Sequence, residues 1–113
     1  MSKLKTRQPL EKEIQKSILE WLQWNKVFCW KQNNAGIYKP DTGQYIPSGK
    51  RGISDIIGVI NGGKFLAIEV KRKGAKSSEV QQEFLDRVTK EGGVAFCADS
   101  LDAVINNLKD YIL

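Results

Sequence analysis

Two runs of β-forming residues, separated by three turn residues, constrain the fold of this chain most strongly. Ile53–Ile60 is apolar and rich in β-branched side chains, and Lys64–Arg72 is a second β run. The segment Asn61-Gly62-Gly63 between them is a signal for a tight turn. We therefore predict that the two runs pair as an antiparallel hairpin.

The length of the turn decides which side chains face one another across this hairpin. If all three residues Asn61–Gly63 form the turn, Ile60 pairs with Lys64, and Asp55 then lies opposite Glu69. Directly opposed residues project to the same side of a sheet, with Cβ atoms roughly 5 Å apart. A shorter turn would shift the register and separate the two carboxylates.

The second run places charged side chains on a largely apolar strand. Because side chains alternate between faces, one face consists of Phe65, Ala67, Glu69 and Lys71. A carboxylate there is costly unless it is paired or binds a cation. Glu69 and Lys71 could form an ordinary cross-strand ion pair. Alternatively, Asp55 and Glu69 hold a cation, for which Mg²⁺ suits an oxygen-only site best and Mn²⁺ is a substitute.

The rest of the chain adds helices and strands on both sides of the hairpin. Apolar residues recur at helical spacing in Leu10–Trp24, and Val27–Trp30 has the composition of a short strand. After the hairpin, Glu79–Glu91 reads as a helix, Val94–Ala98 as a strand, and a last helix begins after Ser100. The order α-β-β-β-α-β-α predicts an α/β fold, with a small mixed β-sheet flanked by helices.

The predicted helices carry three polar residues that could belong to a site. Glu11 lies within the apolar arc of the first helix and so points toward the sheet, and Gln15 borders the same arc. Ser78 offers an N-cap for the second helix, with Gln81 as its capping-box partner. Structural roles alone can also explain them, because a first-turn acid favours the helix dipole and Gln81 can act only as a cap.

Composition excludes several classes of function. The 113 residues suit a single domain, residues 1–113, with a basic arm at 1–9. There is no His and there are only two Cys, which excludes a Ser-His-Asp triad, a His-ligated zinc and a zinc cage. Cys29 and Cys97 could form one disulfide, but reduced thiols in a cytosol fit better. The longest apolar run, about Ile56–Ile60, is too short to span a bilayer, and no signal peptide is visible.

The net charge of +5 suggests a polyanionic partner, and its distribution is uneven. The basic residues gather in the N-terminal arm, in the segment 32–52 and in the turn 71–76. The segment 32–52 is polar, contains no predicted strand and reads as one long loop. A loop of that length in a small domain is usually functional.

Several short sequence motifs lie on the predicted helices and strands. The segments Gly52–Gly58 and Gly63–Lys71 contain Asp55 and the triplet Glu69-Val70-Lys71. Together with Glu11-x-x-Ile14-Gln15, Gln81-x-x-Phe84, Gly92-Gly93 and Asp99–Val104, they resemble the VRR-NUC family of the PD-(D/E)xK nuclease superfamily. The resemblance runs from about Glu11 to Leu108. Ser54 precedes Asp55 where the superfamily has its leading Pro, a mild departure because that position carries no ligand.

The resemblance implies a restriction-endonuclease-like core and a role for each matched residue. Asp55 and Glu69 would ligate Mg²⁺ or Mn²⁺ together with the backbone carbonyl of Val70, and Lys71 would orient the attacking water or stabilise charge on the phosphorane. Glu11 would complete the site directly or through a metal-bound water, with Gln15 and Gln81 as accessory residues. Without an extra domain, the chain resembles the compact stand-alone form of phages and bacteria.

The resemblance also implies a partner, because stand-alone members resemble Holliday-junction resolvases. We expect an endonuclease on branched double-stranded DNA, most simply a four-way junction, acting as a homodimer through Trp21, Trp24 or the last helix. A non-catalytic DNA-binding module and a protein-interaction domain are the alternatives. The residues expected to contact DNA are Lys31, Asn33, Asn34, Tyr38, Lys39, Tyr45, Lys50, Arg51, Arg72, Lys73 and Lys76.

Overall fold

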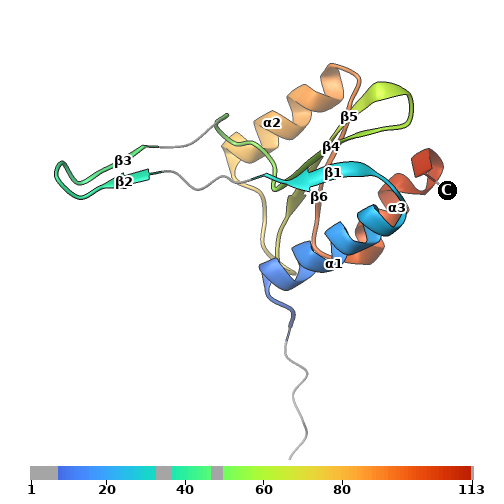
Figure 1. The fold of residues 1–113 in the computed structure, drawn as a ribbon, viewed down its shortest axis with the longest axis horizontal. Coiled ribbons are helices and arrows are strands. Elements are labelled where there is room, and N and C mark those ends of the chain that lie inside the picture. Colours follow the sequence, from blue (N-terminus) through green and yellow to red (C-terminus); the bar gives the residue numbers. More distant parts are fainter. Residues whose placement is uncertain (1–7, 33–36, 47–49, 113) are drawn as a thin grey trace, which may run out of the picture.

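A computed structural model describes residues 8–32, 37–46 and 50–112 of the chain. Figure 1 shows helices and strands in the order α1, β1 to β5, α2, β6 and α3. The helices are α1 (Glu11–Trp24), α2 (Glu79–Lys90) and α3 (Leu101–Ile112). The strands are β1 (Phe28–Lys31), β2 (Ile37–Lys39), β3 (Gln44–Ile46), β4 (Ile56–Ile60), β5 (Lys64–Val70) and β6 (Val94–Ala98).

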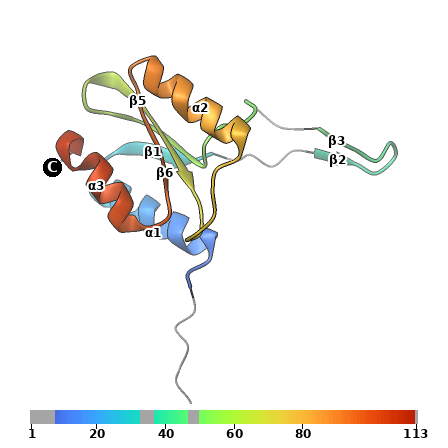
Figure 2. The same ribbon diagram turned by 180° about the vertical axis from the view of Figure 1, so that it is seen from behind.

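Four of these strands form one mixed sheet in the order β1-β4-β5-β6. The pairs β1–β4 and β4–β5 are antiparallel, and β5–β6 is parallel because α2 connects these two strands. Helices α1 and α3 cover one face of the sheet and α2 lies on the other, as Figures 1 and 2 show from opposite sides. The predicted α/β fold with a small mixed sheet and flanking helices is confirmed.

The predicted register of the β4–β5 hairpin is also confirmed. Ile60 pairs with Lys64 and Ile56 with Ile68, so all three residues Asn61–Gly63 belong to the turn. The turn needs glycine because Gly62 and Gly63 have φ angles of 79° and 85°, a region that side chains with a Cβ rarely adopt. The three-residue turn therefore fixes which β4 and β5 side chains share a face.

The main hydrophobic core lies between the sheet and the pair α1–α3. Both strands are shorter than predicted: β4 begins at Ile56, later than the predicted Ile53, and β5 ends at Val70, earlier than the predicted Arg72. Buried side chains from five elements meet in this core, namely Ile14, Ile18, Leu22, Ile56, Ile60, Leu66, Ile68, Val70, Ala98, Val104 and Leu108. A smaller cluster of Ile57, Ala67 and Leu85 lies under α2.

The interpretation of 32–52 as one long loop was wrong for its central part. Strands β2 and β3 form a two-stranded hairpin in which Tyr38 pairs with Tyr45. The turn between them, 40–43, ends at Gly43, whose φ angle of 69° suits a hairpin connection. Figure 1 shows this hairpin extending away from the four-stranded sheet.

Within the described parts of the chain, no helix has both the length and the apolar character needed to cross a membrane.

Candidate active site

Two carboxylates meet at one end of the β4–β5 hairpin. Asp55 directly precedes β4, and Glu69 is the penultimate residue of β5, so the register places them side by side. Asp55 Oδ2 accepts a hydrogen bond of 2.9 Å from the backbone N–H of Val70. This bond connects the residue before β4 to the last residue of β5, and it fixes the direction of the Asp55 carboxylate.

Glu69 is buried and only partly hydrogen-bonded. The residue is 1% exposed. Its Oε1 accepts a hydrogen bond of 3.0 Å from Gln81 Nε2 and lies 3.8 Å from Lys71 Nζ. Its Oε2 is buried and has no hydrogen-bond partner among the described residues. A buried carboxylate oxygen without a donor is the kind of atom that a cation would satisfy.

The surroundings of Glu69 favour its neutral form when no cation is bound. Burial, and then the nearby charge of Asp55, raise the pKa of Glu69 to about 8. The ammonium group of Lys71 acts in the opposite direction, and the Glu11 carboxylate adds a smaller upward effect on the same pKa. Two acids held this close at neutral pH retain a proton unless another positive charge lies between them.

Gln81 connects this site to the start of α2. Its Oε1 accepts a hydrogen bond of 2.8 Å from the backbone N–H of Ser78, so its Nε2 is the end of the amide that faces Glu69. Ser78 Oγ in turn accepts a hydrogen bond of 3.2 Å from the backbone N–H of Gln81. The predicted capping box is thus present, and it orients the amide that donates to Glu69.

Helix α1 contributes at longer range. Glu11, in the first turn of α1, influences the pKa of Glu69 through its charge. Gln15 is buried, at 9% exposure, beside Ile14 and Ile18. Among the described residues, no three His, Cys, Asp or Glu side chains gather as a metal-binding group. The oxygen donors that the fold itself brings together are the carboxylates of Asp55 and Glu69, next to the backbone of Val70.

The profile of the VRR-NUC domain matches residues 5–101, most of the chain. The chain belongs to the VRR-NUC family. A solved structure of a VRR_NUC domain protein is similar to it, with a TM-score of 0.70, 23% sequence identity, and coverage of 94% of this chain and 90% of that one. At that identity the structural likeness shows a shared fold. No curated protein sequence matches the chain.

VRR-NUC is a nuclease-type domain, and this one places its carboxylate pair and Lys71 where the sequence motifs predicted them. The proposed DNA contacts are spread more widely. Lys31 ends β1, and the hairpin β2–β3 carries exposed Tyr38, Lys39 and Tyr45. The other exposed cations lie beside the hairpin β4–β5, namely Lys50, Arg51, Arg72, Lys73 and Lys76. Asn33, Asn34 and residues 1–7 of the basic arm lie outside the described residues.

The two tryptophans of α1 differ in their surroundings. Trp21 is partly buried and packs against the main core, so its role in this VRR-NUC domain is structural. Trp24 is 87% exposed at the end of α1. Of the two, Trp24 is the one whose indole ring can reach another molecule.

Sequence reasoning missed a groove beside the site, lined by Phe65, Phe84 and Arg87 among others. The signal available in the sequence was the position of Phe65, which shares a strand face with Glu69. What the sequence could not show was that α2 leaves this aromatic ring 40% exposed. The groove is formed by segments far apart in the chain.

Proposed function

We propose that this VRR-NUC domain is a divalent-metal-dependent endodeoxyribonuclease that hydrolyses phosphodiester bonds in branched double-stranded DNA, as a Holliday-junction resolvase does. The observation that carries the proposal is the pair of buried Glu69 and half-buried Asp55, with Lys71 beside it. Such a pair costs stability at neutral pH, and a bound cation offsets that cost. The family supports a nuclease, and the preference for four-way junctions rests on the resemblance to stand-alone members.

The donor set suits Mg²⁺, with Mn²⁺ as a substitute, because all donors are oxygen atoms. Asp55, Glu69 and the Val70 carbonyl would hold the ion, and Glu11 would act directly or through a coordinated water. When bound, a divalent ion polarises the phosphate and lowers the pKa of a water molecule. The buried, unpartnered Oε2 of Glu69 fits this role.

The chain's own residues prepare the site for a phosphate. Lys71 Nζ, 3.8 Å from Glu69 Oε1 and only partly buried, can orient a water molecule or stabilise negative charge on the phosphate. Gln81 Nε2 holds Glu69 Oε1, which leaves Oε2 directed away from this amide. The Val70 N–H holds Asp55. These bonds keep both carboxylates in place before a ligand arrives, which lowers the reorganisation needed for catalysis.

A junction has two equivalent strands to cut, and we propose that a homodimer supplies two sites related by a two-fold axis. Exposed Trp24 and the outer side of α3 are candidate contacts. The exposed tyrosines of the β2–β3 hairpin would stack at unpaired bases, and the surrounding cations would bind phosphates. We propose selection by DNA shape, because contacts to phosphates and stacking on unpaired bases carry little sequence information.

The test is cleavage of a labelled four-way junction with Mg²⁺ or Mn²⁺, compared with the matching linear duplex. We expect Asp55→Asn and Lys71→Ala to reduce the rate at least ~100-fold, because each removes part of the charge arrangement. Asp86→Asn and Lys90→Ala, both exposed on α2 and away from the carboxylates, are the matched controls and should cut like the parent protein.

Each other result identifies a different function. Junction binding without metal-dependent cleavage would favour the non-catalytic DNA-binding module. Absence of both metal and DNA binding would favour a protein-interaction domain. Equal cleavage by parent and Asp55→Asn proteins would show that the carboxylate pair is not the active site.

A further inference from the structure

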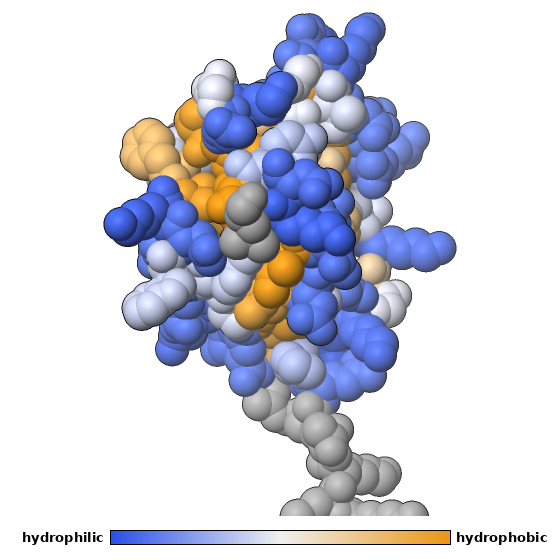
Figure 3. Space-filling model, turned by 90° about the vertical axis from the view of Figure 1, so that its right-hand side faces the viewer, coloured by the Kyte–Doolittle hydropathy of each residue, from blue (hydrophilic) through white to orange (hydrophobic). Residues whose placement is uncertain are grey.

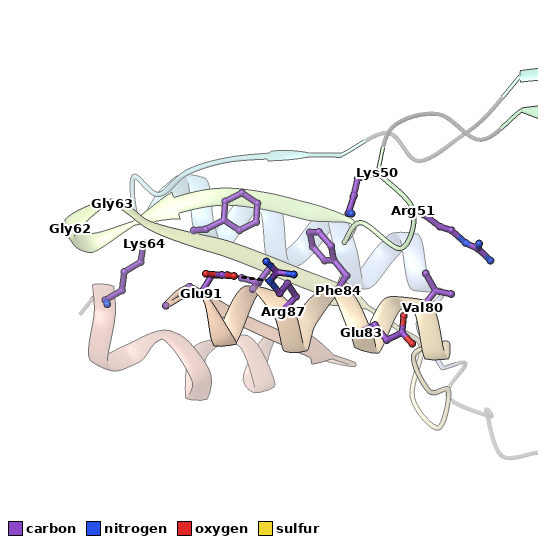
Figure 4. Close-up of a pocket in the computed structure, with 14 residues that line it drawn as sticks. Lys50, Arg51, Gly62, Gly63, Lys64, Val80, Glu83, Phe84, Arg87 and Glu91 are labelled. Carbon is purple, nitrogen blue, oxygen red and sulfur yellow. Dashed lines mark hydrogen bonds and ion pairs between the residues drawn. The ribbon is translucent and has the colours of Figure 1, made fainter.

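A groove of about 830 Å³ runs along α2, on the same side of the sheet as the carboxylate pair. Its floor is β5 near the β4–β5 turn, and its wall is α2 from Val80 to Val88 with Glu91 just after the helix. Figure 4 shows Phe84 and Arg87 projecting from α2 into this space, while Lys50 approaches from the loop before β4. The groove therefore combines apolar and cationic side chains from three separate segments.

The groove and the carboxylate site share one face of β5. Phe65, Ala67 and Glu69 project from the same face because side chains alternate along a strand. Ala67 is buried under α2, whereas Phe65 is 40% exposed. Phe65 and Glu69 are separated by about 13 Å, since a strand rises about 3.3 Å per residue. Because α2 covers Ala67 between them, a chain-like ligand would pass from the site to the groove along the loop that carries Lys50 and Arg51.

The loop before β4 joins these two places. A Cβ atom at Gly52 would lie 2.6 Å from Val80 Cγ1, so this loop packs directly against the first turn of α2. Lys50 and Arg51 are carried by the same loop and line the groove at this end. Gln81, next to Val80, holds Glu69. The cationic end of the groove therefore adjoins the carboxylates.

The lining chemistry favours an anionic chain with flat apolar groups. Two aromatic rings, Phe65 and Phe84, lie among cations that outnumber the acids, with Lys50, Arg51, Lys64 and Arg87 against Glu83 and Glu91. Glu91 is already paired, because its Oε2 lies 2.7 Å from Arg87 Nε. Single-stranded nucleic acid combines phosphates with bases that stack on aromatic rings, and proteins bind it through this combination.

We propose that the groove binds an unpaired strand that leaves the duplex next to the scissile phosphate, with a base stacked on Phe65. This inference rests on the proposed function, since it assigns the path of the same DNA substrate. A second copy of the chain is the competing occupant of an apolar groove. The excess of cations and the shared face with Glu69 favour the nucleic acid.

The experiment measures binding in EDTA, so that no DNA is cut, with the full chain. The probes are a labelled oligothymidylate, a branched duplex with an unpaired thymidine arm, and the same duplex fully paired. We expect Phe65→Ala and Phe65→Leu each to weaken binding of the two probes with unpaired thymidines by roughly 5- to 150-fold, because base–aromatic stacking is lost. Binding of the fully paired duplex should be unchanged.

Charge is tested separately through salt dependence. Lys50→Ala should lower the slope of log affinity against log salt by about 0.7 for the oligothymidylate, the value for one single-strand phosphate contact. The matched controls are Phe28→Ala, an exposed phenylalanine of β1 outside the groove, and Lys16→Ala, an exposed lysine of α1 on the other side of the sheet. Both controls should bind the oligothymidylate like the parent protein.

Two results would overturn the proposal. One is equal oligothymidylate binding by the parent and both Phe65 variants, with thermal melting showing that all are folded. The other is dissociation of a dimer by Phe65→Leu in analytical ultracentrifugation, which would assign the groove to a second copy. Failure of the proposed function is a separate result, namely no cleavage by the parent protein with Mg²⁺ or Mn²⁺, whatever its binding of oligothymidylate.

Discussion

The two faces of the four-stranded sheet differ in how completely they are covered and in what they carry. Under α1 and α3, the side chains of Ile56, Leu66, Ile68 and Val70 are all 0% exposed. On the opposite face, α2 packs mainly on β5 and β6 and leaves β1 uncovered. The large apolar side chains left 37 to 70% exposed there are Phe28, Trp30, Val59 and Phe65.

The open face is also the one with the chemistry. Asp55 and Glu69 lie on it, with Gln81 of α2 as the partner of Glu69. Figure 3 shows orange apolar surface between blue polar patches on the side of the molecule where α3 ends. The closed face supplies stability, and the open face keeps polar groups and surface available for a ligand.

The largest expected effect on stability tests the closed face. Leu66→Ala should lower the free energy of unfolding by about 2–5 kcal/mol, because Leu66 is fully buried between β4, β6 and the helices. Val59→Ala, on the open face and 37% exposed, should cost about 1 kcal/mol or less. Urea denaturation of both variants measures the difference. Similar losses in the two variants would contradict the division between the faces.

The next largest effect is the loss of folding stability when Glu69 is ionised beside Asp55. Folding raises the pKa of Glu69 from 4.5 to about 8, so the folded state binds a proton that the unfolded state has released. Without divalent cations, the contribution of Glu69 to the free energy of unfolding is therefore fully present below pH 4.5. It is lost as the pH rises toward 8. Glu69→Gln removes this loss and should make the protein about 2–4 kcal/mol more stable at pH 8.

Thermal melting in EDTA at pH 5 and pH 8 checks this expectation. The parent protein and Glu69→Gln should differ little at pH 5 and clearly at pH 8. Excess Mg²⁺ should reduce the difference at pH 8, because only the parent protein offers the charged carboxylate. A parent protein whose stability is unchanged between the two pH values would contradict the raised pKa.

The smallest effect concerns the link between α2 and the site. Ser78→Ala removes the cap that accepts a hydrogen bond from the Gln81 N–H, at a cost of about 0.5–2 kcal/mol. Because the same turn orients Gln81 toward Glu69, Mg²⁺ affinity should fall as well. Ser77→Ala is the matched control, since Ser77 Oγ has no hydrogen-bond partner in the described part of the chain. Calorimetric titration with Mg²⁺ distinguishes the two serines.

The sequence was most informative where short-range geometry decides the outcome. The turn length at Asn61–Gly63 fixes the register, and the register alone brings Asp55 beside Glu69. The cap at Ser78 was likewise predictable, because it depends on residues within one turn of helix. Both follow from backbone rules that need no knowledge of distant segments.

Features that depend on packing between distant segments could not be predicted. The influence of Glu11 on the pKa of Glu69 depends on how α1 lies on the sheet. The existence of the groove depends on how much of β5 is covered by α2. The β2–β3 hairpin was missed because its strands are only three residues long and lie among turn-forming residues. Short strands give too few alternating positions to distinguish them from loop.

The β2–β3 hairpin also offers a place where the chain can be cut into two fragments. An isolated two-stranded hairpin is marginally stable in water, so its turn at 40–43 is the natural place for a protease to cut. The piece before the cut carries α1 and β1, and the piece after it carries β4 to α3. Because β1 pairs with β4 and α1 packs in the main core, the two pieces should reassemble when mixed. The protein is thus suited to being expressed as two complementing fragments.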